Sequence, residues 1–148
     1  MGKHSDAALD YARRVQSGEI PACKWARLAI DRQLDDLARE PGDSWPWVFD
    51  ADRAERPCDF LELLPHIKGK WARERRLIEL DPWQCFILTT VFGWVHRDTG
   101  LRRYREAYIE VPRKNGKSLV SAGVGLYMLS ADGEQGAEVY SAATTRDQ

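Results

Sequence analysis

A short apolar run that leads into a tight basic turn constrains this chain more than any other feature. Residues 107–111 (Ala-Tyr-Ile-Glu-Val) include several strand-forming residues, and the turn Pro112–Gly116 follows them directly. Lys117 and Ser118 then open an apolar segment, 119–129, which has the composition of a buried helix. This order predicts a strand, a loop and a helix whose N-terminus faces a bound anion.

The loop carries the chemistry of a polyphosphate site. Backbone N–H groups and a helix N-terminus attract phosphate, so Lys117 is predicted to reach the β- and γ-phosphates of ATP and the Ser118 hydroxyl to ligate Mg²⁺. The usual Walker A signature has glycine six residues before the lysine, where this chain has Val111. Two other interpretations remain open: Lys117 as an exposed lysine, and Ser118 as a helix cap only.

Three segments occur in order along the chain. They are LDPWQCFILTTVFGW from Leu80, YREAYIEVPRKNGKS from Tyr104, and GAEVYSAATTRDQ from Gly136. Together they resemble the N-terminal part of the ATPase domain of tailed-phage and prophage terminase large subunits, which are DNA-packaging motors. The resemblance extends from about Pro65 to Gln148. That family has Pro-Arg-Lys-Asn-Gly-Lys in place of the glycine-led loop.

The resemblance implies that the full-length protein binds ATP and Mg²⁺, translocates viral double-stranded DNA and cleaves the concatemer with a nuclease domain. Its implied partners are that DNA, a small terminase subunit and the portal. The implied nucleotide-binding residues are Gln84, Arg113, Lys114, Asn115, Gly116, Lys117 and Ser118.

Two of these residues have a role that can be stated further. Arg113 is a candidate sensor of the γ-phosphate, although Arg113 and Lys114 would also suit a solvated basic turn. The Gln84 amide both donates and accepts hydrogen bonds, as adenine recognition requires. The alternative is that Pro82-Trp83-Gln84 simply starts a helix.

Motifs that follow in the family have no counterpart before Gln148. There is no Walker B strand, no coupling motif and no cluster of nuclease carboxylates; the one apolar run that ends in an acid, 77–81, precedes the loop. Because hydrolysis needs a carboxylate to orient Mg²⁺ and water, we expect a C-terminally truncated motor that binds nucleotide weakly and does not hydrolyse it alone.

The predicted fold class is α/β. We expect a partial P-loop NTPase parallel sheet, formed as strand–loop–helix–strand, in which helix 117–130 connects parallel strands 107–111 and 137–142. A helical N-terminal extension and linker, 1–58, precedes the incomplete ATPase domain, 59–148.

The remaining elements follow from periodicity and capping signals. Helices are expected at 5–16, 22–40, 60–64 and 82–95, the third capped by Asp59. Residues 41–58 are expected to be a linker or packed loop, because they contain Trp45-Pro46-Trp47 and Pro57. Residues 66–80 are expected to be extended, and Asp98-Thr99-Gly100 to form a turn.

Composition sets the broad class. The chain has 148 residues, of which 43% are hydrophobic and 30% charged, so it is globular; its net charge of −1 argues against non-specific nucleic-acid binding by the whole chain. Three cysteines without metal spacing indicate reduced cytosolic thiols rather than a disulfide framework. The resemblance implies the cytoplasm of a bacterial host cell. No signal peptide and no membrane span are predicted. The three histidines, His4, His66 and His96, lack ligand spacing and are expected to be structural or exposed.

Two other functions remain open. The chain could belong to another P-loop ATPase or kinase, or it could be a non-enzymatic module that docks a small terminase subunit or portal through residues 1–60. Exposure of Trp25, Trp45 and Trp47 on one face would favour docking.

Overall fold

The structure is a computed structural model that describes residues 2–39 and 44–142. It divides into two compact units, unit 1 over Met1–Glu110 and unit 2 over Val111–Gln148. Unit 1 contains helices and a small sheet, and the described part of unit 2 contains one helix, so the chain mixes helices and strands, which is consistent with the α/β class. No helix in the described part of the chain is long and apolar enough to cross a membrane.

Unit 1 is organised around α5 (Pro82–Gly93), an apolar helix that packs against α1 (Lys3–Gln16) and α3 (Ala51–Glu62). α5 has buried residues on nearly every side because two helices and the sheet contact it. α2 (Lys24–Ala38) packs on α1 and closes the core. The buried apolar cluster consists of Ala8, Ala12, Val15, Ile30, Cys85 and Phe86.

The start of α5 follows from its sequence. Pro82 occupies the first turn, where its missing N–H is not needed, and Asp81 with Gln84 forms a capping box. The helices predicted at 5–16, 22–40 and 82–95 are thereby confirmed as α1, α2 and α5, with residue 40 outside the described residues.

The sheet is a single antiparallel pair of β1 (Trp47–Phe49) and β2 (Trp94–His96), with Trp47 opposite His96 and Phe49 opposite Trp94. β2 follows α5 without an intervening residue. The predicted turn at 98–100 is confirmed, because the Gly100 N–H donates to the His96 carbonyl at 2.8 Å.

Two predictions for the middle of the chain are wrong. The expected linker or packed loop, 41–58, contains β1 and the first two thirds of α3, which begins after Asp50 rather than Asp59. The Asp50 carboxylate caps this helix by accepting the Arg53 N–H at 3.0 Å. Pro57 lies inside this helix. An internal proline costs about 3 kcal/mol, which burial of Ala54, Cys58 and Leu61 offsets.

The segment expected to be extended, 66–80, contains the five-residue helix α4 (Gly69–Arg73). The chain enters and leaves α4 through an antiparallel bridge between Pro65 and Leu77. This part of unit 1 is therefore a hairpin with a helical tip rather than an extended connection.

In unit 2, α6 (Lys117–Ser130) has the bounds that the sequence predicted for its helix. Residues 107–111 and 137–142 are not strands in the structure, and the strand pair it does contain is antiparallel. The physical reason is that a strand exists only where its backbone groups bond to a neighbouring strand, and these two segments have no such ladder.

Candidate functional site

In the loop before α6, two residues that are separated by one position adopt the left-handed backbone conformation. Lys114 has a φ of 70° and Gly116 a φ of 71°. Glycine adopts this conformation without cost, but lysine does so with strain. Such strain is found preferentially at functional sites, because the surrounding structure must maintain it. The Asn115 side chain supports the turn by donating from Nδ2 to the Pro112 carbonyl at 3.3 Å.

The N-terminus of α6 has no side-chain cap. Its N-cap is Gly116, and the first helical hydrogen bond runs from the Val120 N–H to the Gly116 carbonyl at 3.0 Å. The N–H groups of Lys117, Ser118 and Leu119 precede that bond and have no partner within the helix. Ser118 does not act as the N-cap, so the interpretation of this serine as a cap only is not supported by the geometry.

Three cationic residues lie in this loop and at the start of α6. Arg113, Lys114 and Lys117 are exposed, and none forms an ion pair within the described residues. A helix N-terminus carries about half a positive charge, so Lys117 at the start of α6 is unfavourable unless an anion binds beside it. The loop and helix end therefore form an anion-binding arrangement with more positive charge than the local fold neutralises.

Gln84 lies in unit 1, whereas the other predicted site residues lie in unit 2. It is only 5% exposed, and its Oε1 accepts the Asp81 N–H at 2.9 Å. This hydrogen bond caps the start of α5, which is the alternative role that the sequence analysis left open for Gln84. The Nε2 donor of Gln84 is not used in that bond, so adenine recognition by Gln84 stays a prediction.

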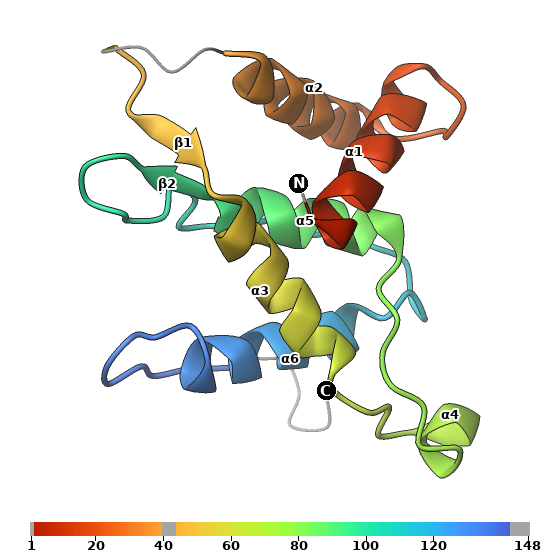
Figure 1. Ribbon diagram of the computed structural model, residues 1–148. Coiled ribbons are helices and arrows are strands. Elements are labelled where there is room, and N and C mark those ends of the chain that lie inside the picture. The colour runs from red at the N-terminus through yellow and green to blue at the C-terminus, as the bar shows by residue number, and fades with distance from the viewer. Residues whose placement is uncertain (1, 40–43, 143–148) are drawn as a thin grey trace. The chain divides into compact units, whose positions relative to one another are not determined.

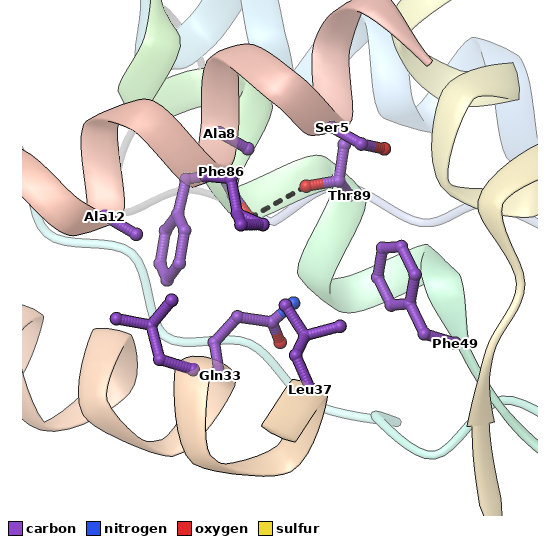
Figure 2. Close-up of a pocket in the computed structure, with 10 residues that line it drawn as sticks. Ser5, Ala8, Ala12, Gln33, Leu37, Phe49, Phe86 and Thr89 are labelled. Carbon is purple, nitrogen blue, oxygen red and sulfur yellow. Dashed lines mark hydrogen bonds between the residues drawn. The ribbon is translucent and has the colours of Figure 1, made fainter. Parts of the chain in front are cut away.

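A small hollow between α1, α2 and α5 is lined mainly by apolar side chains (Figure 2). Its polar side chains are already bonded: Gln33 Oε1 accepts the Trp94 indole N–H at 2.7 Å, and the Thr89 hydroxyl donates to the Cys85 carbonyl at 2.8 Å. A ligand site needs polar groups directed at the ligand, so this hollow is a packing gap in the core.

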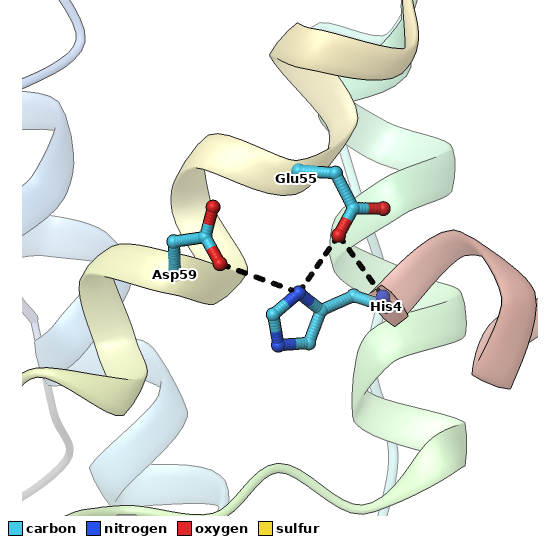
Figure 3. A group of neighbouring side chains, drawn as sticks. All are labelled: His4, Glu55 and Asp59. Atoms are coloured by element: carbon cyan, nitrogen blue, oxygen red, sulfur yellow. Dashed lines mark hydrogen bonds and ion pairs between the residues drawn. The ribbon is translucent and has the colours of Figure 1, made fainter. Parts of the chain in front are cut away.

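A second cluster joins α1 to α3. Ligand-type atoms of His4, Glu55 and Asp59 lie within 4.8 Å of one another (Figure 3). Glu55 is already fully engaged: one oxygen accepts the backbone N–H of His4 at 2.9 Å and pairs with His4 Nδ1 at 2.8 Å, and the other accepts the Ser5 N–H at 2.8 Å and the Ser5 hydroxyl. The carboxylate therefore satisfies the first-turn amides of α1, a structural role, and it has little capacity left for a metal ion.

His4 connects this cluster to a third carboxylate, that of Glu62. Its Nε2 lies 3.1 Å from Glu62 Oε2, an ion pair whose angles fall short of a hydrogen bond. Burial favours the neutral imidazole, but pairing with Glu62 and Glu55 outweighs it and raises the pKa of His4. Burial likewise opposes ionisation of Glu55 and Glu62, but hydrogen bonds lower the pKa of both carboxyl groups.

The cysteines are three free thiols, with Cys23 exposed and Cys58 and Cys85 buried. A hydrogen bond with Cys85, together with burial, raises the pKa of Cys58. None of them lies in the loop before α6.

Of the three tryptophans considered for docking, Trp25 is 73% exposed, whereas Trp45 and Trp47 are half-buried. The Arg103 guanidinium lies 5.1 Å from the Trp45 ring and 5.8 Å from the Trp47 ring. Exposure of all three rings on one face is therefore not observed.

Sequence reasoning missed the contacts that join distant segments. His4 and Glu55 are 51 residues apart, and Arg103 and Asp36 are 67 residues apart. No local pattern signals such pairs. The loop, in contrast, is a contiguous motif, so it could be recognised from the amino-acid sequence alone.

An uncapped helix N-terminus behind a basic Gly-Lys-Ser loop is an arrangement that suits an anion such as phosphate. Residues 82–148 match the family model of the terminase large subunit, ATPase domain. This match confirms the resemblance of the three motifs to that family and supports a DNA-packaging terminase ATPase role. Searches of curated proteins and of solved structures gave no match.

Proposed function

We propose that residues 112–118 and the N-terminus of α6 bind the polyphosphate of ATP together with Mg²⁺. The observation that carries the proposal is the uncapped start of a 14-residue helix directly behind a loop with Lys114 and Gly116 in the left-handed conformation. Successive amides in such a loop create a concave donor surface that suits phosphate oxygens.

Each loop residue then has a distinct role. Lys117 would neutralise the β- and γ-phosphates, and Arg113 with Lys114 would contact the γ-phosphate from the turn. Asn115 maintains the turn through its bond to the Pro112 carbonyl. Ser118 would offer its hydroxyl to Mg²⁺, which would neutralise phosphate charge and position the nucleotide.

Gln84 is proposed to contact adenine through its Nε2 donor. Gln84 lies within the segment that matches the family model, residues 82–148. Its Oε1 would keep capping α5, so that nucleotide binding and the order of α5 would be linked.

We also propose that 107–111 and 137–142 become parallel strands of one sheet in the assembled motor, with α6 as the helix that connects them. Tyr108, Ile109, Val139 and Tyr140 are large apolar or aromatic side chains that are all exposed here, as is expected of strand residues without a covering layer. In this interpretation 1–58 is an N-terminal extension and 59–148 the start of the ATPase domain.

The whole motor is proposed to package viral double-stranded DNA with a small terminase subunit and a portal, because the family match concerns a packaging ATPase. ATP binding by this chain would supply the nucleotide site of that machine. The location that follows from this role is the cytoplasm of a bacterial host.

Replacing Lys117 by alanine tests the proposal. The loss of charge-assisted bonds to phosphate is worth about 1.5–3 kcal/mol, so ATP affinity should fall about tenfold to a hundredfold in calorimetric titrations with Mg²⁺. Lys24→Ala, an exposed lysine at the start of α2, is the matched control and should bind ATP as the wild type does. Equal affinities for wild type and Lys117→Ala would reject this lysine as the phosphate ligand.

A further inference from the structure

Residues 66–76, which we name the basic hairpin, form a projecting element of unit 1 with α4 at its tip (Figure 1). Its base is secured by two backbone hydrogen bonds, from the His66 N–H to the Arg76 carbonyl and from the Ile78 N–H to the Leu64 carbonyl, both at 2.9 Å. Ile78 is buried, but α4 itself has no buried residue. The hairpin is anchored in the core at its base, and its tip contributes little to packing.

The charge of the basic hairpin differs from that of the whole chain. It contains five basic residues and one acidic residue, a net charge of +4 in a chain whose net charge is −1. The basic side chains are Lys68, Lys70, Arg73, Arg75 and Arg76, and all of them are exposed. An element that adds so little to the core and concentrates so much charge suits a polyanionic partner.

Most of this charge is not neutralised locally. Lys70 pairs with Glu74 and Arg76 with Glu79, each at 3.6 Å between exposed groups, which is a weak interaction. The other three cations, Lys68, Arg73 and Arg75, form no ion pair within the part of the chain that the structure describes.

An aromatic ring is held among these cations. Trp71 is 51% exposed; the His66 ring lies 4.8 Å from it, centre to centre, and the Arg76 guanidinium 5.8 Å from its centre. These contacts fix the orientation of Trp71 while leaving about half of it accessible. Arg75 has a φ of 52°, a left-handed conformation that is rare for arginine and turns the chain sharply after α4.

We propose that the basic hairpin contacts the phosphate backbone of double-stranded DNA without reading its sequence. Long cationic side chains on a projecting loop suit the regularly spaced phosphates of a duplex. Sequence readout needs side chains inserted among base edges, and Lys68, Arg73 and Arg75 instead provide point charges and forks for phosphate. The choice of DNA as the polyanion rests on the packaging role proposed above.

The test is the affinity of the 148-residue chain for a short fluorescently labelled DNA duplex, measured by anisotropy over a range of salt concentrations and without nucleotide. Lys68→Gln/Arg73→Gln/Arg75→Gln should raise the Kd about tenfold or more and lower the slope of log K against log salt by roughly three. A second duplex of scrambled sequence should bind with the same affinity.

The matched control is Arg13→Gln/Lys24→Gln/Arg56→Gln, which removes the same charge from exposed positions of unit 1 outside the basic hairpin. It should lower affinity much less. Equal losses in the two triple variants, no loss in the hairpin variant, no binding by the wild type, or a strong preference between the duplexes would each overturn the proposal. Because ATP titration of the hairpin variant should give the wild-type affinity, failure of DNA contact and failure of the nucleotide site are separate results.

Discussion

Replacement of His4 by leucine is expected to destabilise unit 1 by about 2–3 kcal/mol. Removing one member of a buried ion pair commonly costs about 3–5 kcal/mol, because it leaves a carboxylate buried without its counter-charge. The lower figure applies here because both carboxylates keep other donors: Glu55 keeps the backbone N–H groups of His4 and Ser5, and Glu62 keeps Lys3 at 2.7 Å. The His4 side chain is 3% exposed, so water cannot replace the lost contacts.

The same substitution should change how stability depends on pH. The pKa of His4 is raised from 6.5, so its contribution to stability is complete below pH 6.5 and is lost as pH rises through the higher value of the folded state. The pKa values of Glu55 and Glu62 are lowered from 4.5, so their contribution is complete above pH 4.5 and is lost as pH falls through the lower folded values. Wild-type unit 1 should therefore be most stable between about pH 4.5 and pH 6.5.

Urea denaturation followed by tryptophan fluorescence is the assay, because all six tryptophans precede residue 95 and report on unit 1 alone. The wild type should lose stability as the pH rises above 6.5, and His4→Leu should be less stable and nearly independent of pH over the same range. His66→Gln, which lies outside the cluster, should retain the wild-type pH dependence. If His4→Leu were as stable as the wild type, or retained its pH dependence, the ion-pair account of this cluster would be refuted.

Two further substitutions test the packing of unit 1. Gly93→Ala should cost about 1–3 kcal/mol in urea denaturation, because the added Cβ would lie 2.6 Å from the Phe49 ring and 2.9 Å from the Ala54 Cβ. Wild-type stability of this variant would show that β1 and α3 can move away from the end of α5. Arg103→Met should cost about 3 kcal/mol by the same measurement, because it removes the main partner of Asp36, which is 3% exposed and bonded to Arg103 at 2.7 Å. A loss below 1 kcal/mol would indicate that Arg39 or water replaces Arg103 as the partner of Asp36.

The helices could be predicted from the sequence because their signals are local. Periodic apolar residues define α1 and α2, Pro82 with its capping box defines the start of α5, and the Gly-Lys-Ser turn defines the start of α6. The start of α3 was misplaced because Asp50 and Asp59 are both good caps, and burial of the helix around Pro57 decided between them.

The strands could not be predicted for the opposite reason. β1 and β2 have three residues each and exist because Trp47–Phe49 meets Trp94–His96, a contact between segments almost 50 residues apart. The segments 107–111 and 137–142 have strand-forming sequences, but sequence preference does not supply a partner strand. For the site, the loop was found because it is contiguous, whereas the position of Gln84 relative to it depends on tertiary structure.

The most direct test of the nucleotide site is an amide-resolved NMR titration of the isotopically labelled chain with ATP and Mg²⁺. We expect saturable shifts of the Gly116, Lys117 and Ser118 amides, because these N–H groups would face the phosphates at the uncapped start of α6 in the proposed site. The shifts should vanish in Lys117→Ala at the same nucleotide concentration. Unchanged loop amides in the wild type, or saturable shifts confined to unit 1, would contradict the assignment of residues 112–118 as the phosphate-binding loop.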